Sequence, residues 1–227
     1  MSLIVDNVSL VLGDGDQQIT ALDEVSTTVN QGELVAIVGP SGAGKSSLLA
    51  VCGGLRKPTS GSISIDGEQI STLPAAQLTR IRRDRIGFVF QQSNLVPALT
   101  AVDQLLLLVH MQGRRPGSAD RERALALLDE VDMSHRADRR PDQMSGGERQ
   151  RVGIARALMT EPRLMLVDEP TSMLDHNRGQ AIVELLAARC REHLVATLMV
   201  THDHGMLAAA SRVLNISDGK LSESSAG

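Results

Sequence analysis

A glycine-rich loop directly after a fully apolar run constrains the fold of this chain more than any other feature. The loop spans Gly39-Pro40-Ser41-Gly42-Ala43-Gly44-Lys45-Ser46 and matches the pattern G-x-x-x-x-G-K-[ST]. Residues 34–38 before it are apolar at every position, as in a parallel strand that is covered on both faces. Leu48, Leu49 and Val51 after it are spaced as on a helix. This order predicts an α/β fold with a parallel sheet and a phosphate site.

The loop has the chemistry of a polyphosphate site. Its glycines allow successive backbone N–H groups to converge on an anion, and the following helix N-terminus adds about half a positive charge. Lys45 is placed to reach the β- and γ-phosphate oxygens, and the Ser46 hydroxyl is placed to ligate Mg²⁺. We therefore expect a nucleotide polyphosphate as the ligand and Mg²⁺ as its cofactor, held by Gly39, Pro40, Ser41, Gly42, Ala43, Gly44, Lys45, Ser46 and Ser47.

Two adjacent carboxylates follow a second apolar run. Asp168 and Glu169 come directly after residues 164–167, which are all apolar. In a doubly wound sheet, the end of such a strand lies beside the phosphate loop. Adjacent side chains point in different directions, so Asp168 suits the Mg²⁺ shell and Glu169 suits a general base that orients water. Together with the loop, the pair predicts a hydrolytic site.

A second anion site is predicted before another helix. Ser145, Gly146, Gly147 and Glu148 precede an apolar helical pattern, so a serine N-cap with two glycines stands at a helix start. The simpler interpretation is a capped helix without a ligand. Two phosphate sites exceed what one nucleotide requires, unless the second site serves the nucleotide of another copy of the chain.

The remaining patterns divide the chain into lobes. Short β-like runs between Leu3 and Ile70 predict an antiparallel β lobe. The middle of the chain is helical in pattern and predicts an inserted helical lobe. Two more runs typical of buried strands, at 164–167 and 197–200, have a helix between them and return to the parallel sheet. The expected division is a single domain, 1–227, with a helical lobe at 92–160 and a catalytic core with the β lobe at 1–91 and 161–227.

Composition excludes several classes of function. The net charge of −4 gives no reason to expect nucleic acid as a partner. Arg80, Arg82, Arg83 and Arg85 form a basic stretch, but Asp84 interrupts it, which favours a solvated surface over a lipid or nucleic-acid patch. The two cysteines lack metal-ligand neighbours, which indicates a reduced chain without disulfide or zinc. No signal peptide is expected, and no apolar stretch reaches the ~18 residues needed to cross a bilayer.

These elements in this order resemble the ATP-binding cassette (ABC) family along nearly the whole chain. Met144-Ser145-Gly146-Gly147-Glu148 is similar to the signature sequence of that family, with Met in place of the usual Leu. The resemblance implies a P-loop ABC ATPase fold with a mixed, mostly parallel RecA-like core. It also implies a head-to-tail dimer, in which Ser145 and Gly147 contact the γ-phosphate that is held by Lys45 of the second copy.

Three further positions match ABC elements. Gln91 resembles the Q-loop glutamine, which senses Mg²⁺ and water, although Gln92 is a near-equal alternative by sequence. Asp175, at the end of residues 172–175, is similar to the D-loop residue that crosses between subunits. His202, directly after an apolar run, resembles the switch histidine that hydrogen-bonds the γ-phosphate. The resemblance thus implies catalytic roles for Glu169, His202, Lys45 and Gln91, and a Mg²⁺ site of Ser46, Gln91 and Asp168.

Residues 81–101 are similar to one branch of that family, which includes lipoprotein-release, macrolide-export, haem-export and antimicrobial-peptide resistance systems. The resemblance implies a transmembrane permease as partner, so that the chain lies peripherally on the cytoplasmic face of the membrane. It favours export of haem or another toxic hydrophobic compound, with lipoproteins, macrolides or peptides as alternatives. A non-transport ABC ATPase is disfavoured because the sequence has no long coiled-coil or zinc insertion. A P-loop kinase or GTPase leaves Gly146-Gly147 and His202 without a role.

Leu12 is expected to contact the base, at a position where the family usually has an aromatic residue that stacks on adenine. The sequence has no Tyr or Trp. Because aromatic stacking on a base contributes about 1–3 kcal/mol in nucleic-acid binders, an aliphatic contact weakens selectivity for the base. We predict comparable ATP and GTP hydrolysis by the purified chain, measured by phosphate release. A GTP rate about a hundredfold below the ATP rate contradicts this prediction.

Overall fold

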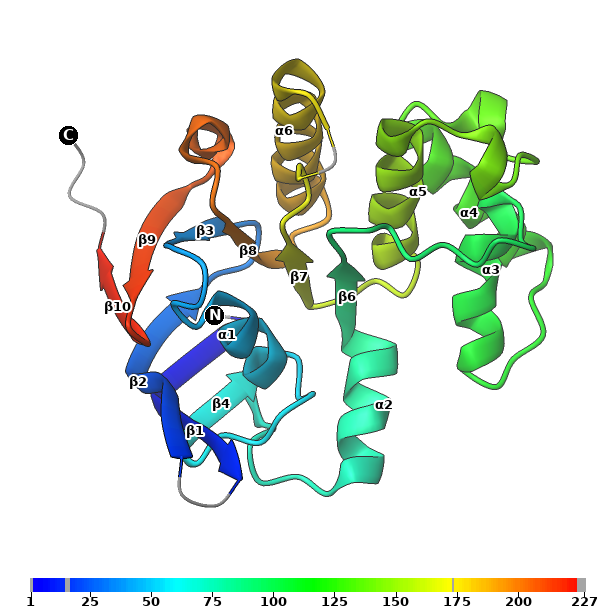
Figure 1. Cartoon of the computed structure of the whole chain (residues 1–227). Helices are drawn as coiled ribbons and strands as arrows, with labels where there is room; N and C mark the ends of the chain where they lie inside the picture. Colours follow the sequence, from blue (N-terminus) through cyan, green and yellow to red (C-terminus); the bar gives the residue numbers. More distant parts are fainter. Residues whose placement is uncertain (1, 15–16, 173, 224–227) are drawn as a thin grey trace.

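The computed structural model describes residues 2–14, 17–172 and 174–223. Within these ranges, the chain forms two β-sheets with helix α1 between them and other helices around the larger sheet (Figure 1). Met173, which belongs to the expected D-loop segment, and residues 224–227 lie outside the described residues.

The smaller sheet is antiparallel and forms from the N-terminal part of the chain. Its described strands run in the order β2-β1-β4-β5, with bounds β1 (Leu3–Asp14), β2 (Gln17–Val29), β4 (Ser60–Ile65) and β5 (Glu68–Gln69). Leu3 and Val5 are buried at a two-residue period. At Asn7, where φ is 51°, the register shifts, and the period resumes with Val8 and Leu10. This sheet is the predicted antiparallel β lobe.

The larger sheet is mostly parallel. Its described strands run in the order β10-β9-β3-β8-β7-β6, with bounds β3 (Leu34–Val38), β6 (Ile86–Val89), β7 (Leu164–Asp168), β8 (Ala196–Thr201), β9 (Arg212–Ser217) and β10 (Lys220–Glu223). β10 pairs antiparallel with β9, whereas the other described neighbours are parallel. All residues of β3 are buried, with Leu34 and Ala36 in one hydrophobic cluster and Val35 and Ile37 in another. Burial on both faces explains the apolar run, and the predicted α/β fold is confirmed.

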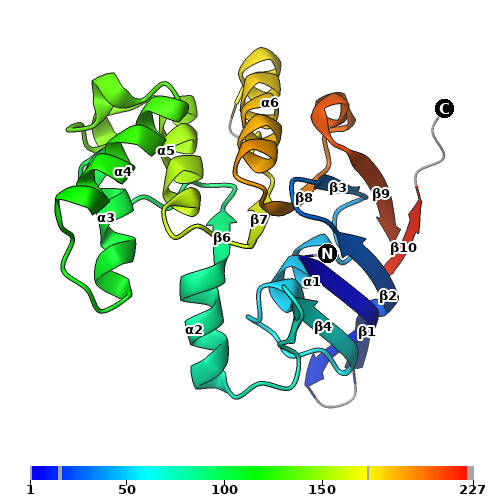
Figure 2. The same ribbon diagram turned by 180° about the vertical axis from the view of Figure 1, so that it is seen from behind.

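Helices cover both faces of the larger sheet. The α-helices are α1 (Lys45–Cys52), α2 (Ala75–Arg85), α3 (Ala101–Met111), α4 (Ser118–Glu130), α5 (Gly146–Leu158) and α6 (His176–Glu192), and the 3-10 helices are η1 (Ser134–Arg136), η2 (Pro141–Gln143) and η3 (His204–Ala209). Helices α3, α4 and α5 gather beyond β6, at one end of the sheet, and both views agree on this (Figures 1 and 2). In the described part of the chain, no helix has the length and apolar character needed to cross a bilayer.

Several elements were not predicted from the sequence, among them strands β9 and β10, helix α2 and strand β6. Helix α2 buries Ile81 but has no continuous apolar stripe, because much of its surface is arginine. Strand β6 has four residues and includes Gly87, so its run of β-forming residues is too short to be recognised. Its place is fixed instead by pairing with β7.

The basic stretch lies on α2, and its arginines are engaged locally. Arg80 and Arg83 pair with Asp84 at 3.7 and 2.8 Å, Arg85 pairs with Glu68 at 2.7 Å, and Arg82 donates to the Gly54 carbonyl at 2.7 Å. These contacts agree with the expectation of a surface stretch rather than a patch of free cations.

Gly87 brings β6 into close contact with α5. A Cβ at this position would lie 2.5 Å from the Ala157 carbonyl oxygen. We therefore predict that Gly87→Ala lowers the free energy of unfolding by about 1–3 kcal/mol, because one backbone must shift. Urea unfolding measures the loss. Gly117→Ala is the matched control, since the nearest atom would lie 3.9 Å from its Cβ. Equal losses in both variants contradict the prediction.

Candidate functional site

The glycine loop lines a cavity of about 800 Å³ between the ends of the two sheets. The other walls come from the ends of β7 and β8, from residues within β1 and β2, and from the turn after β9. The structure brings together, around this cavity, the predicted residues Leu12, Ser41, Gly42, Gly44, Lys45, Ser46, Ser47, Gln91, Asp168, Glu169 and His202. Gly39, Pro40 and Ala43 complete the loop without lining the cavity.

Two glycines let the loop pass close to other parts of the backbone. A Cβ at Gly39 would collide with the carbonyl oxygen of Ile216, and a Cβ at Gly44 would collide with that of Ala21. Gly44 also has φ of 107°, a conformation that disfavours other residues. The loop can therefore fold in this narrow space only with glycine at these positions.

Lys45 is folded back over the loop. Its Nζ donates to the carbonyl oxygens of Gly39 at 2.6 Å and Pro40 at 2.9 Å, and the residue is only 9% exposed. Lys45 also begins α1, whose N-terminal N–H groups lack helical partners. The cation, these N–H groups and the Ser46 and Ser47 side chains place positive charge and donors along one wall, which suits a polyphosphate.

Two carboxylates face this positive wall. Burial and the neighbouring charge of Glu169 raise the pKa of Asp168, while the Lys45 cation acts in the opposite direction. Glu169 has φ of 45°, and its N–H donates to the Val200 carbonyl at 3.0 Å. Parallel pairing of β7 with β8 thus fixes both carboxylates beside the loop.

Glu169 and His202 are in direct contact. His202 Nδ1 lies 2.7 Å from Glu169 Oε2, and the His202 N–H donates to the same oxygen at 3.3 Å. The Glu169 side chain is 14% exposed, whereas that of His202 is 66% exposed. The imidazole therefore covers a nearly buried carboxylate from the solvent side.

The structure separates Gln91 from Gln92. Gln91 lines the cavity with Asp168, whereas Gln92 lines only a neighbouring depression. Helix α5 holds the loop that carries Gln91, because Gln150 Nε2 donates to the Phe90 carbonyl at 3.1 Å and Arg156 donates to the next turn of that loop. Burial lowers the pKa of the Arg156 guanidinium.

The second predicted anion site does not lie in this cavity. Ser145 caps α5, where its Oγ accepts from the Glu148 N–H at 3.2 Å and its own N–H donates to Glu148 Oε2 at 2.7 Å. That backbone hydrogen bond lowers the pKa of Glu148. Gly146 lines the neighbouring depression, and a Cβ at Gly147 would meet Leu174 at 3.8 Å. Ser145, Gly146, Gly147 and Glu148 are thus apart from the loop within one chain.

Asp175 is likewise apart from the cavity. It is the N-cap of α6, and its side chain accepts from the Arg178 N–H at 3.1 Å. Its carboxylate also pairs with the Arg178 side chain at 3.3 Å. The start of α6 and the start of α5 are therefore both capped and lie outside the cavity.

Sequence reasoning missed several residues of the cavity, which are Ile19, Thr20, Ala21, Asp218 and Gly219. Ile19 pairs with Leu12 across β1 and β2 and is 67% exposed, so two aliphatic side chains stand together at the rim. Asp218 and Gly219 arrive through the β9–β10 turn, which no local pattern could assign to the site.

The cavity suits Mg²⁺ only together with a phosphate ligand. Among the described residues, no group of three or more His, Cys, Asp or Glu side chains could hold a metal ion. Asp168, Ser46 and Gln91 supply oxygen donors around the same cavity. Mg²⁺ prefers oxygen and is commonly held by one or two carboxylates plus substrate phosphates, so this donor set fits it. The fold and the cavity define a P-loop nucleotide-hydrolysing protein.

Comparison with known proteins identifies the family. The model of the family described as ABC transporter matches residues 22–172, more than half of the chain. The chain belongs to this family and is an ATP-binding subunit that hydrolyses ATP. It is 40% identical to a putative hemin import ATP-binding protein HrtA of Staphylococcus haemolyticus, over 97% of this chain and 99% of the relative. It is 41% identical to a lipoprotein-releasing system ATP-binding protein LolD of Shewanella denitrificans, over 98% and 95%.

Solved structures give the same result. The dimeric ATP-binding cassette MJ0796 of Methanocaldococcus jannaschii, in a post-hydrolysis state bound to ADP and Pi, is similar with a TM-score of 0.85 and 39% identity, over 97% of this chain and 98% of that chain. The cbiO1 chain of Clostridium perfringens, part of the transporter complex cbiONQ, has a TM-score of 0.86 and 27% identity, over 97% and 86%. The predicted resemblance to the ABC family is confirmed.

Proposed function

We propose that two copies of this chain bind two ATP molecules head to tail and that hydrolysis drives a separate permease. The proposal depends on one observation: the two predicted anion-binding helix N-termini, those of α1 and α5, do not lie in the same cavity of one chain. The loop before α1 lines the cavity, whereas Ser145 and Gly147 at the start of α5 do not. A second copy supplies the missing start of α5 to the cavity. The dimeric cassette described above supports this arrangement.

The loop and its neighbours hold the polyphosphate in this proposal. Lys45 exchanges its two carbonyl acceptors for phosphate oxygens, which present more negative charge. Ser46, Asp168 and Gln91 would hold Mg²⁺, which would supply charge stabilisation at the transferring phosphate. Leu12 and Ile19 contact the base through aliphatic surface.

Glu169 acts as the general base for the attacking water, and His202 orients it. The contact at 2.7 Å fixes one carboxylate oxygen of Glu169 and leaves the other available to accept a proton. The exposed imidazole is placed to meet the γ-phosphate as a hydrogen-bond donor. Glu169 is 14% exposed, so bulk water competes little for its carboxylate.

An apolar groove is proposed as the contact with the permease. It encloses about 640 Å³ beside α2 and α3 and exposes Leu55 and Met111 at 58% and 57%. Phe90 and Asn94 also line it, and they belong to the same loop as Gln91, so this loop joins the groove to the nucleotide cavity. Exposed apolar surface of this kind marks interaction sites. Through this partner the chain lies peripherally on the cytoplasmic face of the membrane.

Export of haem or another toxic hydrophobic compound is the proposed transport reaction. The similarity to HrtA supports haem as cargo, although that relative is described as an import protein. The similarity to LolD supports release of lipoproteins as the alternative. The similarity of residues 81–101 to exporters favours the outward direction, while macrolides and antimicrobial peptides remain alternative cargoes.

We also propose that residues 1–227 act as one domain, with a helical lobe at 92–160 joined to the core at 1–91 and 161–227. A shared hydrophobic cluster supports this, because it includes Leu105 and Ile154 of the lobe together with Met165 and Ile182 of the core. The lobe can then transmit force to and from the nucleotide cavity.

Head-to-tail pairing predicts complementation between two inactive variants. Lys45→Ala removes the loop cation, and Gly147→Asp places a carboxylate toward the partner's phosphate while remaining compatible with a helix N-terminus. In a mixed dimer, one site has both an intact loop and an intact α5 start. We expect ATPase activity after mixing to be about tenfold or more above either variant alone. A mixture of Lys45→Ala with the Lys45→Ala/Gly147→Asp double variant is the control and stays inactive. An inactive test mixture rejects the shared site.

Glu169→Gln tests the base. We expect ATP binding to be kept, turnover to fall by about a hundredfold or more, and a dimer to accumulate with ATP in size-exclusion chromatography. Glu122→Gln is the matched control, because Glu122 is exposed and does not line the cavity. Turnover of about a tenth of the wild-type rate in Glu169→Gln rejects Glu169 as the base.

A further inference from the structure

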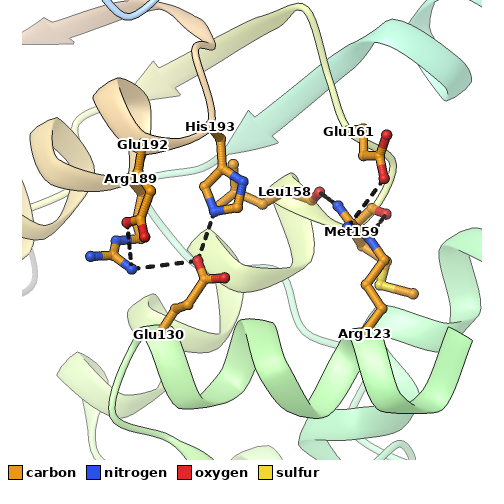
Figure 3. A network of polar contacts seen from close by, with 8 residues as sticks. All are labelled: Arg123, Glu130, Leu158, Met159, Glu161, Arg189, Glu192 and His193. Atoms are coloured by element: carbon orange, nitrogen blue, oxygen red, sulfur yellow. Dashed lines mark hydrogen bonds and ion pairs between the residues drawn. The ribbon is translucent and has the colours of Figure 1, made fainter. Parts of the chain in front are cut away.

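A chain of polar contacts joins the C-terminal ends of helices α4 and α6 (Figure 3). Glu130 is the last residue of α4, and its Oε2 lies 2.7 Å from His193 Nε2 and 3.5 Å from Arg189 Nη1. Arg189 lies in the last turn of α6, and His193 is its C-cap. Arg189 also pairs with Glu192 at 2.9 Å. The Glu130 carboxylate therefore links the two helix ends.

Arg123 joins the same helix to the end of α5. It lies two turns before Glu130, on the same side of α4. Its Nε donates to the Met159 carbonyl and its Nη2 to the Leu158 carbonyl, both at 3.2 Å, and Nη1 pairs with Glu161 at 3.1 Å (Figure 3). Carbonyls at a helix C-terminus lack helical partners and favour a cation. Helix α4 is thus bound to the C-terminal ends of both α5 and α6.

The opposite ends of α5 and α6 carry the segments that face the second copy in the proposed dimer. Ser145 caps the N-terminus of α5, and Asp175 caps the N-terminus of α6. A helix is a stiff rod, so a restraint on one end limits where the other end lies. The contacts of α4 therefore act on the spacing and tilt of both segments.

If Glu130 is lost, few other contacts of Arg189 and His193 can connect α6 to α4. The side chains of Arg189, His193 and Glu130 are 19%, 25% and 27% exposed, so the contacts are partly screened from water. Without Glu130, Arg189 keeps Glu192, whose side chain is 55% exposed and belongs to α6 itself. That remaining pair does not connect α6 to α4.

We propose that Glu130 is a positioning residue for ATP-driven dimerisation, because it holds α5 and α6 in the arrangement that presents Ser145 and Asp175 to the second copy. This inference rests on the proposed head-to-tail dimer. Glu130 touches neither nucleotide nor cavity and acts through Arg189 and His193. When the link between α4 and α6 is lost, a smaller fraction of the molecules has the arrangement that can dimerise. The apparent affinity of one ATP-bound copy for another falls by the same factor.

The test measures dimer formation in the Glu169→Gln background as ATP is raised. Adding Glu130→Gln removes the charge and keeps the shape, and we expect the ATP concentration for half-maximal dimerisation to rise about threefold to tenfold. The affinity of the same protein for ADP stays unchanged, since ADP lacks the γ-phosphate and its proposed contacts all belong to one copy of the chain. Glu122→Gln is the matched control on α4, because Glu122 is exposed and has no ion pair within the described residues.

A second variant separates positioning from a general loss of stability. Arg189→Gln is expected to raise the ATP requirement, and the double variant Glu130→Gln/Arg189→Gln is expected to raise it no further than the larger single effect. The inference is overturned if Glu130→Gln keeps its ADP affinity and gives a dimerisation curve like that of Glu122→Gln. It is also overturned if Glu130→Gln loses ADP binding in parallel with dimerisation. If Glu169→Gln alone fails to dimerise with ATP, the proposed dimer is wrong instead.

Discussion

The close approach of the glycine loop to two other strands is the constraint on which the rest of the structure depends. Gly39 lies against the carbonyl of Ile216 in β9, and Gly44 lies against that of Ala21 in β2. The Gly219 N–H donates to the Ala43 carbonyl at 3.1 Å, and the Asp23 N–H donates to the Gly219 carbonyl at 2.9 Å. The loop is therefore held between the antiparallel and the parallel sheet, and this is why both sheets contribute to the nucleotide cavity.

The chemistry of the cavity follows from parallel strand order. β7 and β8 are neighbouring parallel strands that end at the same edge of the sheet. Asp168 and Glu169 therefore lie beside the loop together with His202, although His202 is distant from them in the sequence. Opposite charges then meet across the cavity, with Lys45 on one wall and two carboxylates on the other. Burial raises the pKa of Asp168, and a bound cation would favour its ionised form again.

The sequence was informative where function imposes local patterns. The glycine loop, the strand before Asp168 and the capped start of α5 each combine a period with a turn or cap signal, and the structure has the expected element at each. Helix α2 and strand β6 gave no such signal, because their positions depend on neighbours such as β7 and Gly54. Ile19 reached the cavity through its pairing with Leu12. Asp218 reached it through the β9–β10 turn, which contacts the distant glycine loop where the Gly219 N–H donates to the Ala43 carbonyl. The choice between Gln91 and Gln92 also required the folded chain.

The contacts within the helical lobe and those that join it to the core differ in kind, and this difference bears on movement. Apolar residues of α5 and α6 share one cluster, and apolar packing resists separation but has little directional preference. The ion pairs of Glu130 and the carbonyl contacts of Arg123 and Arg156 are directional. They connect α4 with α6, α4 with α5, and α5 with the Gln91 loop at defined points. Since these contacts lie at helix ends, they permit little relative rotation while they persist. The nucleotide cavity, the Gln91 loop and the start of α5 are therefore mechanically connected within each copy, although their ligand contacts are completed only between copies.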